Sequence, residues 1–179
     1  MTIIVGITGG IGSGKSTLSK EIRKKNFKLL DSDEIVANIY NKPTKSFIKY
    51  LKKIELGNSI KGKKINKKQI SNVIFSNNNI KSKLEDYIFK IVRKKREIFI
   101  KNEKKRKTNI IFLDIPLLFE NNLNRSFNII ISVISSKKER YKRLKISKNM
   151  SKEMFNKIIK SQTSDIVRKR KSDIIIINN

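Results

Sequence analysis

The sequence predicts an α/β fold in which helices flank a five-stranded parallel sheet. Apolar runs of strand length occupy residues 2–8, 27–31, 109–114, 127–134 and 173–177. Nearly unbroken runs of this kind are typical of strands that are buried on both faces of a parallel sheet. The runs alternate with segments of helical periodicity, so we expect helices to connect the strands.

The connections after the first two runs differ in length. Residues 15–25 place Leu18 and Ile22 at i, i+4 spacing, which indicates one face of a helix. From residue 34 to residue 106 the pattern is helical, with a break at the asparagines of residues 77–79. We therefore expect the connection between the second and third strands to be enlarged into a helical lobe at about residues 34–106.

Two further helices are expected after the fourth strand, at residues 136–145 and 151–162. The second opens with Ser151, and serine is a favoured cap for a helix start. No repeat stands out, and no segment rich in Pro, Gly or Ser divides the chain. The sequence therefore predicts a single domain over residues 1–179 that includes the helical lobe.

The composition excludes several kinds of chemistry. The chain contains neither Cys nor His. Disulfides, zinc sites built from these residues, thiol nucleophiles and imidazole bases are therefore excluded. Any general base must be an Asp, Glu, Lys or Tyr side chain.

The charge is strongly positive, because the chain has 43 Lys and Arg residues but only 15 Asp and Glu residues, which gives a formal net charge of +28. The basic residues are spread along the whole chain, and stretches such as residues 61–68 lack aromatic side chains on which bases stack. We therefore interpret the charge as a compositional bias that also attracts polyanionic substrates, and we expect no specific nucleic acid partner. A nucleic-acid-stimulated ATPase is the alternative that this charge suggests.

The sequence carries no membrane or targeting signal. The most apolar runs are far shorter than the ~20 residues of a membrane helix. The first residues lack a charged leader, so we expect no signal peptide. We expect a cytoplasmic protein that is a monomer or a weak homo-oligomer.

The strongest motif follows the first strand directly. Residues 9–16 read GGIGSGKS and match the pattern G-x-x-x-x-G-K-S/T of a P-loop, so the fold is expected to be of the P-loop NTPase type. Glycines let successive N–H groups face one concavity, and the next helix directs its positive end at the same anion. Lys15 would reach the β- and γ-phosphates of ATP, and the Ser16 hydroxyl would bind Mg²⁺. The residues expected to bind ATP are Gly10, Ile11, Gly12, Ser13, Gly14, Lys15, Ser16 and Thr17.

Carboxylates near the ends of the predicted strands are the candidate acid–base groups. Ligands of open α/β sheets bind beyond these ends, where Asp31 and Asp33 follow the second strand and Asp114 ends the third. In an extended segment Asp31 and Asp33 point the same way, so one would accept a hydroxyl proton while the other holds a water or the metal shell. Two structural interpretations stay open: a helix cap for Asp31 and Asp33, and a turn residue ahead of Pro116 for Asp114.

Three segments taken in order resemble the dephospho-CoA kinase family of P-loop kinases. They are GITGGIGSGKST, DSD at residues 31–33, and DIPLLFEN at residues 114–121. The loop alone is generic, whereas its pairing with the segment after the third strand is much more specific. Gln162 and Arg168 extend the similarity along the chain, and it is weakest in the central lobe.

The resemblance implies that the protein uses ATP and Mg²⁺ to phosphorylate the 3′-hydroxyl of dephospho-CoA, the last step of CoA biosynthesis. Asp33 would be the base or orienting group at that hydroxyl. Arg143, with Arg140 one turn earlier, would stabilise charge on the transferring group, and residues 143–150 would form a mobile lid. The acceptor would be bound by Asp31, Asp33, Leu117, Phe119 and Glu120.

The chain departs from the family pattern at several positions. Phe89-Lys90 stands where the family usually has His-Pro, Ala37 replaces an arginine, and Ser147 replaces a second lid arginine, with Lys148 beside it. These differences bear on rate and stability more than on reaction type. The alternatives are another P-loop small-molecule kinase, such as one similar to nucleoside monophosphate kinases, and an inactive relative.

Overall fold

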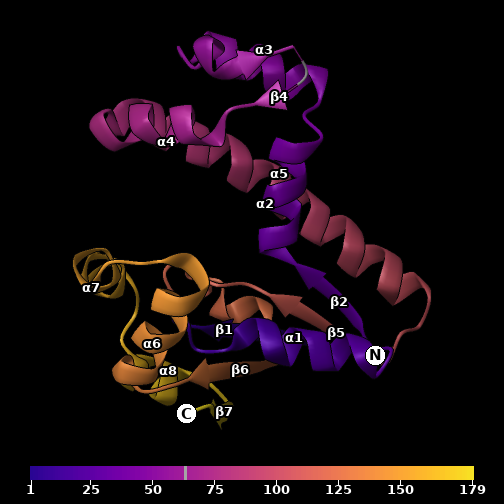
Figure 1. The fold of residues 1–179 in the computed structure, drawn as a ribbon. Coiled ribbons are helices and arrows are strands. Elements are labelled where there is room, and N and C mark those ends of the chain that lie inside the picture. The colour runs from indigo at the N-terminus through magenta and orange to yellow at the C-terminus, as the bar shows by residue number, and fades with distance from the viewer. Residues whose placement is uncertain (63) are drawn as a thin grey trace. The chain divides into compact units, whose positions relative to one another are not determined.

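The computed structural model of the chain describes residues 1–62 and 64–179. The chain forms two compact units, one of Met1–Asp31 with Ile100–Asn179 and one of Ser32–Phe99. We call the first the sheet unit and the second the helical unit (Figure 1). Each unit is described by itself.

The sheet unit is built on a five-stranded parallel sheet with the order β2-β5-β1-β6-β7. Its strands are β1 (Ile3–Gly9), β2 (Lys28–Asp31), β5 (Ile110–Asp114), β6 (Ile129–Ile134) and β7 (Ile174–Ile177). Each strand overlaps one of the predicted apolar runs, so the predicted sheet is confirmed. The central strand β1 is buried over most of its length, because helices cover sheet faces in this architecture.

Four helices lie wholly in the sheet unit. They are α1 (Lys15–Lys24), α6 (Lys137–Lys148), α7 (Lys152–Ser161) and α8 (Asp165–Lys171), with a short 3-10 turn η2 (Asn124–Ser126). The first three match the predicted helices, whereas α8 was not predicted. Its seven residues are too few for a helical period to stand out in the sequence.

Serine caps fix the starts of the three helices that follow β6. The hydroxyls of Ser136, Ser151 and Ser164 accept hydrogen bonds from the backbone N–H three residues later. Each cap satisfies one of the donors that a helix start leaves without an intrahelical acceptor. The sequence signal for the α8 start was therefore Ser164, followed by the acidic Asp165 in its first turn.

The helical unit holds the elements between β2 and the end of the lobe. They are α2 (Ser32–Asn41), α3 (Lys45–Lys53), η1 (Gly57–Ser59), β3 (Ile60–Lys61), β4 (Lys64–Ile65), α4 (Lys67–Ser76) and most of α5 (Asn78–Lys105). The break predicted at residues 77–79 is confirmed, because the Asn77 side chain accepts hydrogen bonds from the N–H groups of Asn79 and Ile80. The short antiparallel pair β3-β4 was not predicted.

An aromatic cluster lies at the centre of the helical unit. Phe47 of α3 is 1% exposed, packs edge-on against Tyr40 of α2 and stacks on Tyr87 of α5. Tyr50 stacks on the same Tyr87 ring, with centroids 4.0 Å apart. Aromatic pairs contribute beyond the area that they bury, so this cluster, with the buried Phe47 at its centre, ties three helices into one small core.

Glu103 in the last part of α5 makes the stability of the sheet unit depend on pH. Its buried carboxylate accepts hydrogen bonds from Thr108 Oγ1 at 2.8 Å and from Arg106 Nη1 at 2.7 Å. The Thr108 bond, and then the bond and charge of Arg106, hold its pKa below the ordinary value of 4.5. A carboxylate with a lowered pKa stabilises the folded state above its unfolded pKa, and this contribution is lost as the pH falls through the folded pKa.

We therefore expect Glu103→Gln to lower the melting temperature at neutral pH and to flatten its decline at pH values below 4.5. Thermal unfolding from neutral pH to about pH 3 measures this effect. Glu21→Gln, at an exposed carboxylate of α1, is the matched control and should follow the wild type. If Glu103→Gln lost stability on acidification as steeply as the wild type, Glu103 would not be the titrating group.

Candidate active site

The loop after β1 has the backbone of a phosphate cradle. Gly12 and Gly14 adopt positive φ angles of 74° and 96°, which L side chains rarely adopt. At Gly14 a Cβ would also lie 1.9 Å from the Nδ2 atom of Asn178. The loop is fastened by Asn178 Nδ2, which donates to the Ser13 carbonyl at 2.9 Å, and its shape therefore depends on glycine at these positions.

The start of α1 completes the cradle. Gly14 is the cap residue and Lys15 and Ser16 are the first helical residues, whose N–H groups have no intrahelical acceptor. The positive end of the helix macrodipole lies at the same place. The buried Ser13 hydroxyl also has no hydrogen-bond partner among the described residues. This arrangement suits an anion with several acceptor oxygens, as in a nucleotide phosphate.

Lys15 is held by a buried carboxylate. Its Nζ lies 2.5 Å from Oδ1 of Asp114, and Ser19 Oγ donates to Oδ2 at 2.6 Å. Asp114 ends β5, is 1% exposed and pairs in register with Ile7 of β1 and Asp31 of β2. Asp114 is thus more than a turn residue, because it orients the lysine of the phosphate loop at the carboxyl edge of the sheet.

Two arginines of α6 lie against the same loop. Arg140 Nε donates to the Ile11 carbonyl at 2.8 Å, and its guanidinium is 3% exposed. Arg143 Nη1 lies 3.4 Å from the carbonyl oxygens of Gly12 and Ser13. Burial lowers the pKa of Arg140, and the charge of Asp165 opposes that shift. The structure therefore brings Lys15 and both predicted arginines to the predicted loop.

The segment after β5 carries the predicted acceptor residues of the sheet unit. Leu117 is 37% exposed, whereas Phe119 is 6% exposed and belongs to the core. The Glu120 carboxylate accepts hydrogen bonds from the Thr163 N–H at 2.7 Å and from Arg168 Nη2 at 3.2 Å. The predicted set thus divides here into one exposed residue, one core residue and one carboxylate bound to a buried arginine.

The two aspartates where β2 ends and α2 begins fall in different units. Asp31 is the last residue of β2, and Asp33 lies in the first turn of α2. Because α2 begins at Ser32, the carboxylate of Asp33 is also placed where negative charge stabilises a helix start. The role of either carboxylate toward an acceptor remains a prediction.

The sequence profile of the dephospho-CoA kinase family matches residues 3–179. The chain belongs to the dephospho-CoA kinase family. A relative named dephospho-CoA kinase from Fusobacterium nucleatum is 38% identical over 180 residues, which cover 99% of this chain and 90% of the relative. Another dephospho-CoA kinase, from Streptococcus mutans, is 31% identical over 180 residues, which cover 100% of this chain and 90% of the relative. The family predicted from the sequence is confirmed.

Solved structures of similar fold also match the chain. A dephospho-CoA kinase from Campylobacter jejuni matches with a TM-score of 0.71 at 27% identity, covering 100% of this chain and 89% of that chain. The Thermus thermophilus protein TT1252 matches with a TM-score of 0.82 at 24% identity, and the match covers 99% of this chain and 89% of that chain. A shikimate kinase from Acinetobacter baumannii in complex with shikimate matches with a TM-score of 0.50 at 14% identity, and the match covers 100% of this chain and 85% of that chain. The last two likenesses show the fold alone, and the predicted P-loop kinase fold is confirmed.

Membership of the dephospho-CoA kinase family also confirms the predicted enzyme class, a phosphotransferase. A kinase family implies ATP as the co-substrate. The name of this family differs from two of the alternatives, a nucleoside monophosphate kinase and a nucleic-acid-stimulated ATPase. In the part of the chain that the structure describes, no helix is long and apolar enough to cross a membrane.

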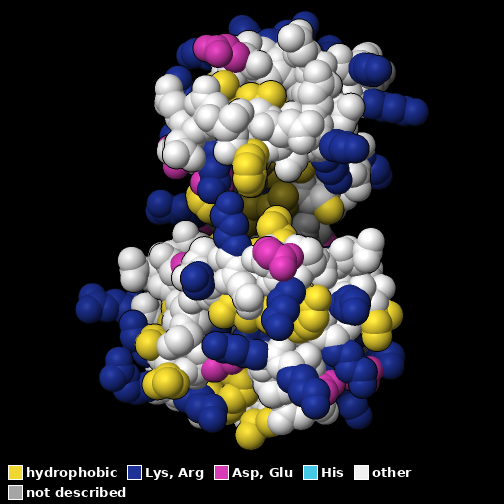
Figure 2. All heavy atoms as spheres, turned by 60° about the vertical axis from the view of Figure 1, so that its left-hand side comes forward, with side chains coloured by type: hydrophobic (Ala, Val, Ile, Leu, Met, Phe, Trp, Pro, Cys, Tyr) yellow, Lys and Arg dark blue, Asp and Glu magenta, His cyan; other side chains and the backbone are white. Residues whose placement is uncertain are grey.

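Positive charge is widespread on the surface of this dephospho-CoA kinase family member. Figure 2 shows Lys and Arg side chains scattered over both units on the face drawn, rather than gathered in one patch. On that face, the dispersed distribution differs from the stripe or patch that usually marks a nucleic-acid-binding surface.

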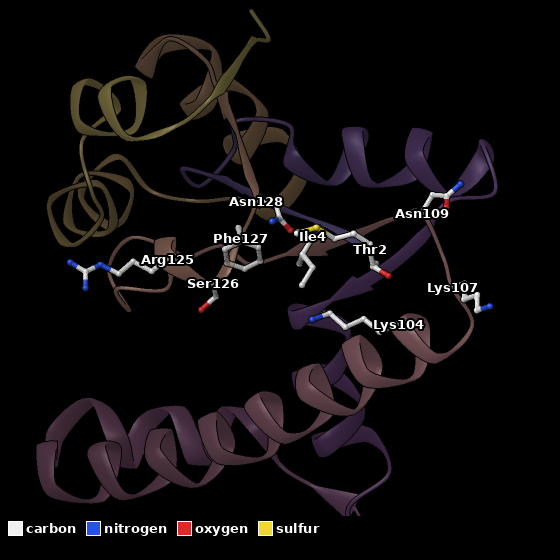
Figure 3. Close-up of a pocket in the computed structure, with 10 residues that line it drawn as sticks. Thr2, Ile4, Lys104, Lys107, Asn109, Arg125, Ser126, Phe127 and Asn128 are labelled. Atoms are coloured by element: carbon white, nitrogen blue, oxygen red, sulfur yellow. The ribbon is translucent and has the colours of Figure 1, made fainter.

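A cavity of about 690 Å³ opens at the other edge of the sheet, near the amino ends of β1 and β6 (Figure 3). Ile4 and Phe127 form its apolar part, and Lys104 extends over it from α5. Lys107 and Arg125 lie toward its two ends. Three of the ten lining residues are Lys or Arg, a proportion not far above that of the whole chain, where 43 of 179 residues are Lys or Arg, so the cavity carries no distinct charge signature. The phosphate loop lies at the opposite ends of these parallel strands.

Proposed function

We propose that the chain transfers the γ-phosphoryl group of ATP to the 3′-hydroxyl of dephospho-CoA and so catalyses the last step of CoA biosynthesis. The match of the family profile to residues 3–179, with the phosphate loop intact within it, carries this proposal. A bond forms between the 3′ oxygen and the γ-phosphorus, and the bond from that phosphorus to the β–γ bridging oxygen breaks. ADP leaves, and the hydroxyl proton passes to a base.

ATP is held at the loop between β1 and α1. The N–H groups at the start of α1 bind the phosphate oxygens, and Lys15 moves from Asp114 to the β- and γ-phosphates. Positioning and electrostatic stabilisation account for most catalysis in phosphoryl transfer, since the protein makes no covalent bond to the group. The lid of residues 143–150 excludes water, which keeps ATP from being hydrolysed.

The residues at the loop also fit a magnesium ion. Mg²⁺ takes oxygen ligands and is usually bound by one or two protein groups together with substrate phosphates. Ser16 offers an exposed hydroxyl in the first turn of α1, and Asp114 offers the buried carboxylate on which Lys15 rests. No cluster of three or more acidic side chains that could hold a metal occurs among the described residues. Bound there, Mg²⁺ would neutralise charge on the phosphates.

Asp33 is the proposed base or orienting group at the acceptor hydroxyl. Three features support it: the chain has no His or Cys, the family pattern has an Asp here, and Asp33 follows the strand end at which Asp31 pairs with Asp114. Ligands of open α/β sheets bind beyond such strand ends. Leu117, exposed in the segment after β5, would contact the acceptor, while the buried Phe119 would support that segment from the core.

ADP release measured across a panel of acceptors tests this function. Dephospho-CoA should give the highest kcat/KM, and nucleoside monophosphates and shikimate should stay at the rate without acceptor. The reason is that a site built to hydrogen-bond one acceptor leaves polar groups unpaired with another. A preference for a nucleoside monophosphate would overturn the proposal, and stimulation by DNA or RNA would point to a nucleic-acid-dependent ATPase. Action in the cytoplasm, as a monomer or weak homo-oligomer, is part of the same proposal.

A further inference from the structure

Two buried arginines share one carboxylate in the sheet unit. Among the described residues, Arg140 and Arg168 are the only buried cations, with 3% and 1% exposed. The Asp165 carboxylate accepts a hydrogen bond from each of them: Arg140 Nη1 donates to Oδ2 at 3.2 Å, and Arg168 Nη1 donates to Oδ1 at 3.1 Å. A buried guanidinium is unfavourable unless it is paired, so the environment of each arginine depends on Asp165.

One side of this network ends on the phosphate loop. Arg140 Nε donates to the Ile11 carbonyl at 2.8 Å, and Gln162 Oε1 accepts from the Ile11 N–H at 3.0 Å. Both backbone polar groups of Ile11 are therefore held by side chains from α6 and from the end of α7. A planar guanidinium with one nitrogen on Asp165 and another on the loop is fixed in orientation.

The other side of the network ends on the segment after β5. Arg168 Nη2 donates to Glu120 Oε1 at 3.2 Å, and Arg168 Nη1 donates to the Thr163 carbonyl. The Thr163 N–H donates to the same Glu120 oxygen at 2.7 Å. Glu120 lies in the segment that also carries Leu117, so Arg168 connects α8 to the proposed acceptor segment.

We propose that Asp165 is a positioning residue for phosphoryl transfer, acting through Arg140 on the ATP-binding loop and through Arg168 on the acceptor segment. The acceptor half of this inference rests on the proposed function. Stabilising networks normally satisfy their buried polar atoms, whereas Arg168 Nε and Glu120 Oε2 have no partner among the described residues. These two atoms stay without hydrogen bonds, while both arginines remain directed at the ATP-binding loop and the acceptor segment.

Asp165→Asn is the direct test, because it keeps the shape of the side chain and removes the charge that both arginines need. We expect the dissociation constant of ATP to rise about tenfold, the change that follows from losing one charge-assisted hydrogen bond. The KM for dephospho-CoA should rise as well, through Arg168 and Glu120. Equilibrium binding of ATP and steady-state kinetics, both well below the melting temperature, measure these effects.

Glu103→Gln is the matched control. It also removes the charge of a buried carboxylate in the sheet unit, one that accepts from an arginine and a threonine, but it lies at the end of α5 away from the loop. We expect it to lower the melting temperature without changing the ATP dissociation constant. If Asp165→Asn lowered the melting temperature but left ATP affinity and both KM values at the wild-type level, Asp165 would be structural only and the proposal would be overturned.

A second variant keeps the test decisive if Asp165→Asn does not fold. Arg140→Lys retains a charge for Asp165 but loses the forked geometry that also reaches Ile11. It should raise the ATP dissociation constant as Asp165→Asn does, and wild-type affinity would overturn the proposal. ATP binding does not depend on the acceptor, so a wild-type protein that binds ATP but does not phosphorylate dephospho-CoA would refute only the proposed function.

Discussion

Lys15→Ala is expected to lower the rate of phosphoryl transfer by at least about 10²-fold, as loss of one transition-state donor does. In the structure its ammonium group rests on Asp114 and no other described side chain of the loop carries a charge. Removing it takes away the positive charge that would meet the β- and γ-phosphates. Rates at saturating ATP, measured by rapid quench, separate this effect from weaker binding.

Among the described residues, the same substitution leaves the Ser19 hydroxyl as the one side-chain hydrogen-bond partner of the buried Asp114 carboxylate, so stability should fall as well. Activity is therefore to be compared at a temperature where both proteins are folded by circular dichroism. Lys20→Ala, on the exposed face of the same helix, is the control and should keep wild-type turnover. A folded Lys15→Ala protein with wild-type turnover would remove Lys15 from the mechanism.

Asp33→Asn is expected to lower turnover with dephospho-CoA by about 10²-fold or more, the contribution typical of a positioned general base. The amide keeps the size of the side chain but does not accept the hydroxyl proton. ATP binding should stay close to the wild type, because the loop between β1 and α1 is unchanged. Parallel measurements of the ATP dissociation constant and of kcat test the two halves of this prediction.

Asp86→Asn offers a control within the helical unit, since it removes an exposed carboxylate of α5. It should leave both quantities unchanged. Equal turnover of Asp33→Asn and the wild type would exclude Asp33 as the base. A matching loss of ATP affinity would instead indicate that Asp33 contributes to the donor site.

The sheet was predictable because a strand that is buried on both faces needs a nearly unbroken run of apolar residues. Apolar runs such as residues 110–113 contain few polar residues, and the glycines of the loop have backbone angles that favour glycine. Local signals of this kind lie within a few residues of one another. They identify the strands, the loop and the break before α5.

The partners of the site residues were not predictable in the same way. Arg140 was expected to face the transferring phosphoryl group, and the sequence held no sign that Asp165, on the unpredicted helix α8, would bind it. Glu120 likewise is held by Arg168, 48 residues later in the chain. Among 43 basic residues nothing local distinguishes the two arginines that become buried, because burial depends on which helices pack together.

A single-turnover experiment tests the central claim most directly. The protein in excess is mixed with Mg²⁺, ATP labelled in its γ-phosphate and dephospho-CoA, and the products are separated and the position of the label determined. We expect the label to appear on the 3′-oxygen of CoA in a phase that Lys15→Ala slows. Labelled inorganic phosphate without labelled CoA, from protein that binds ATP, would contradict the account.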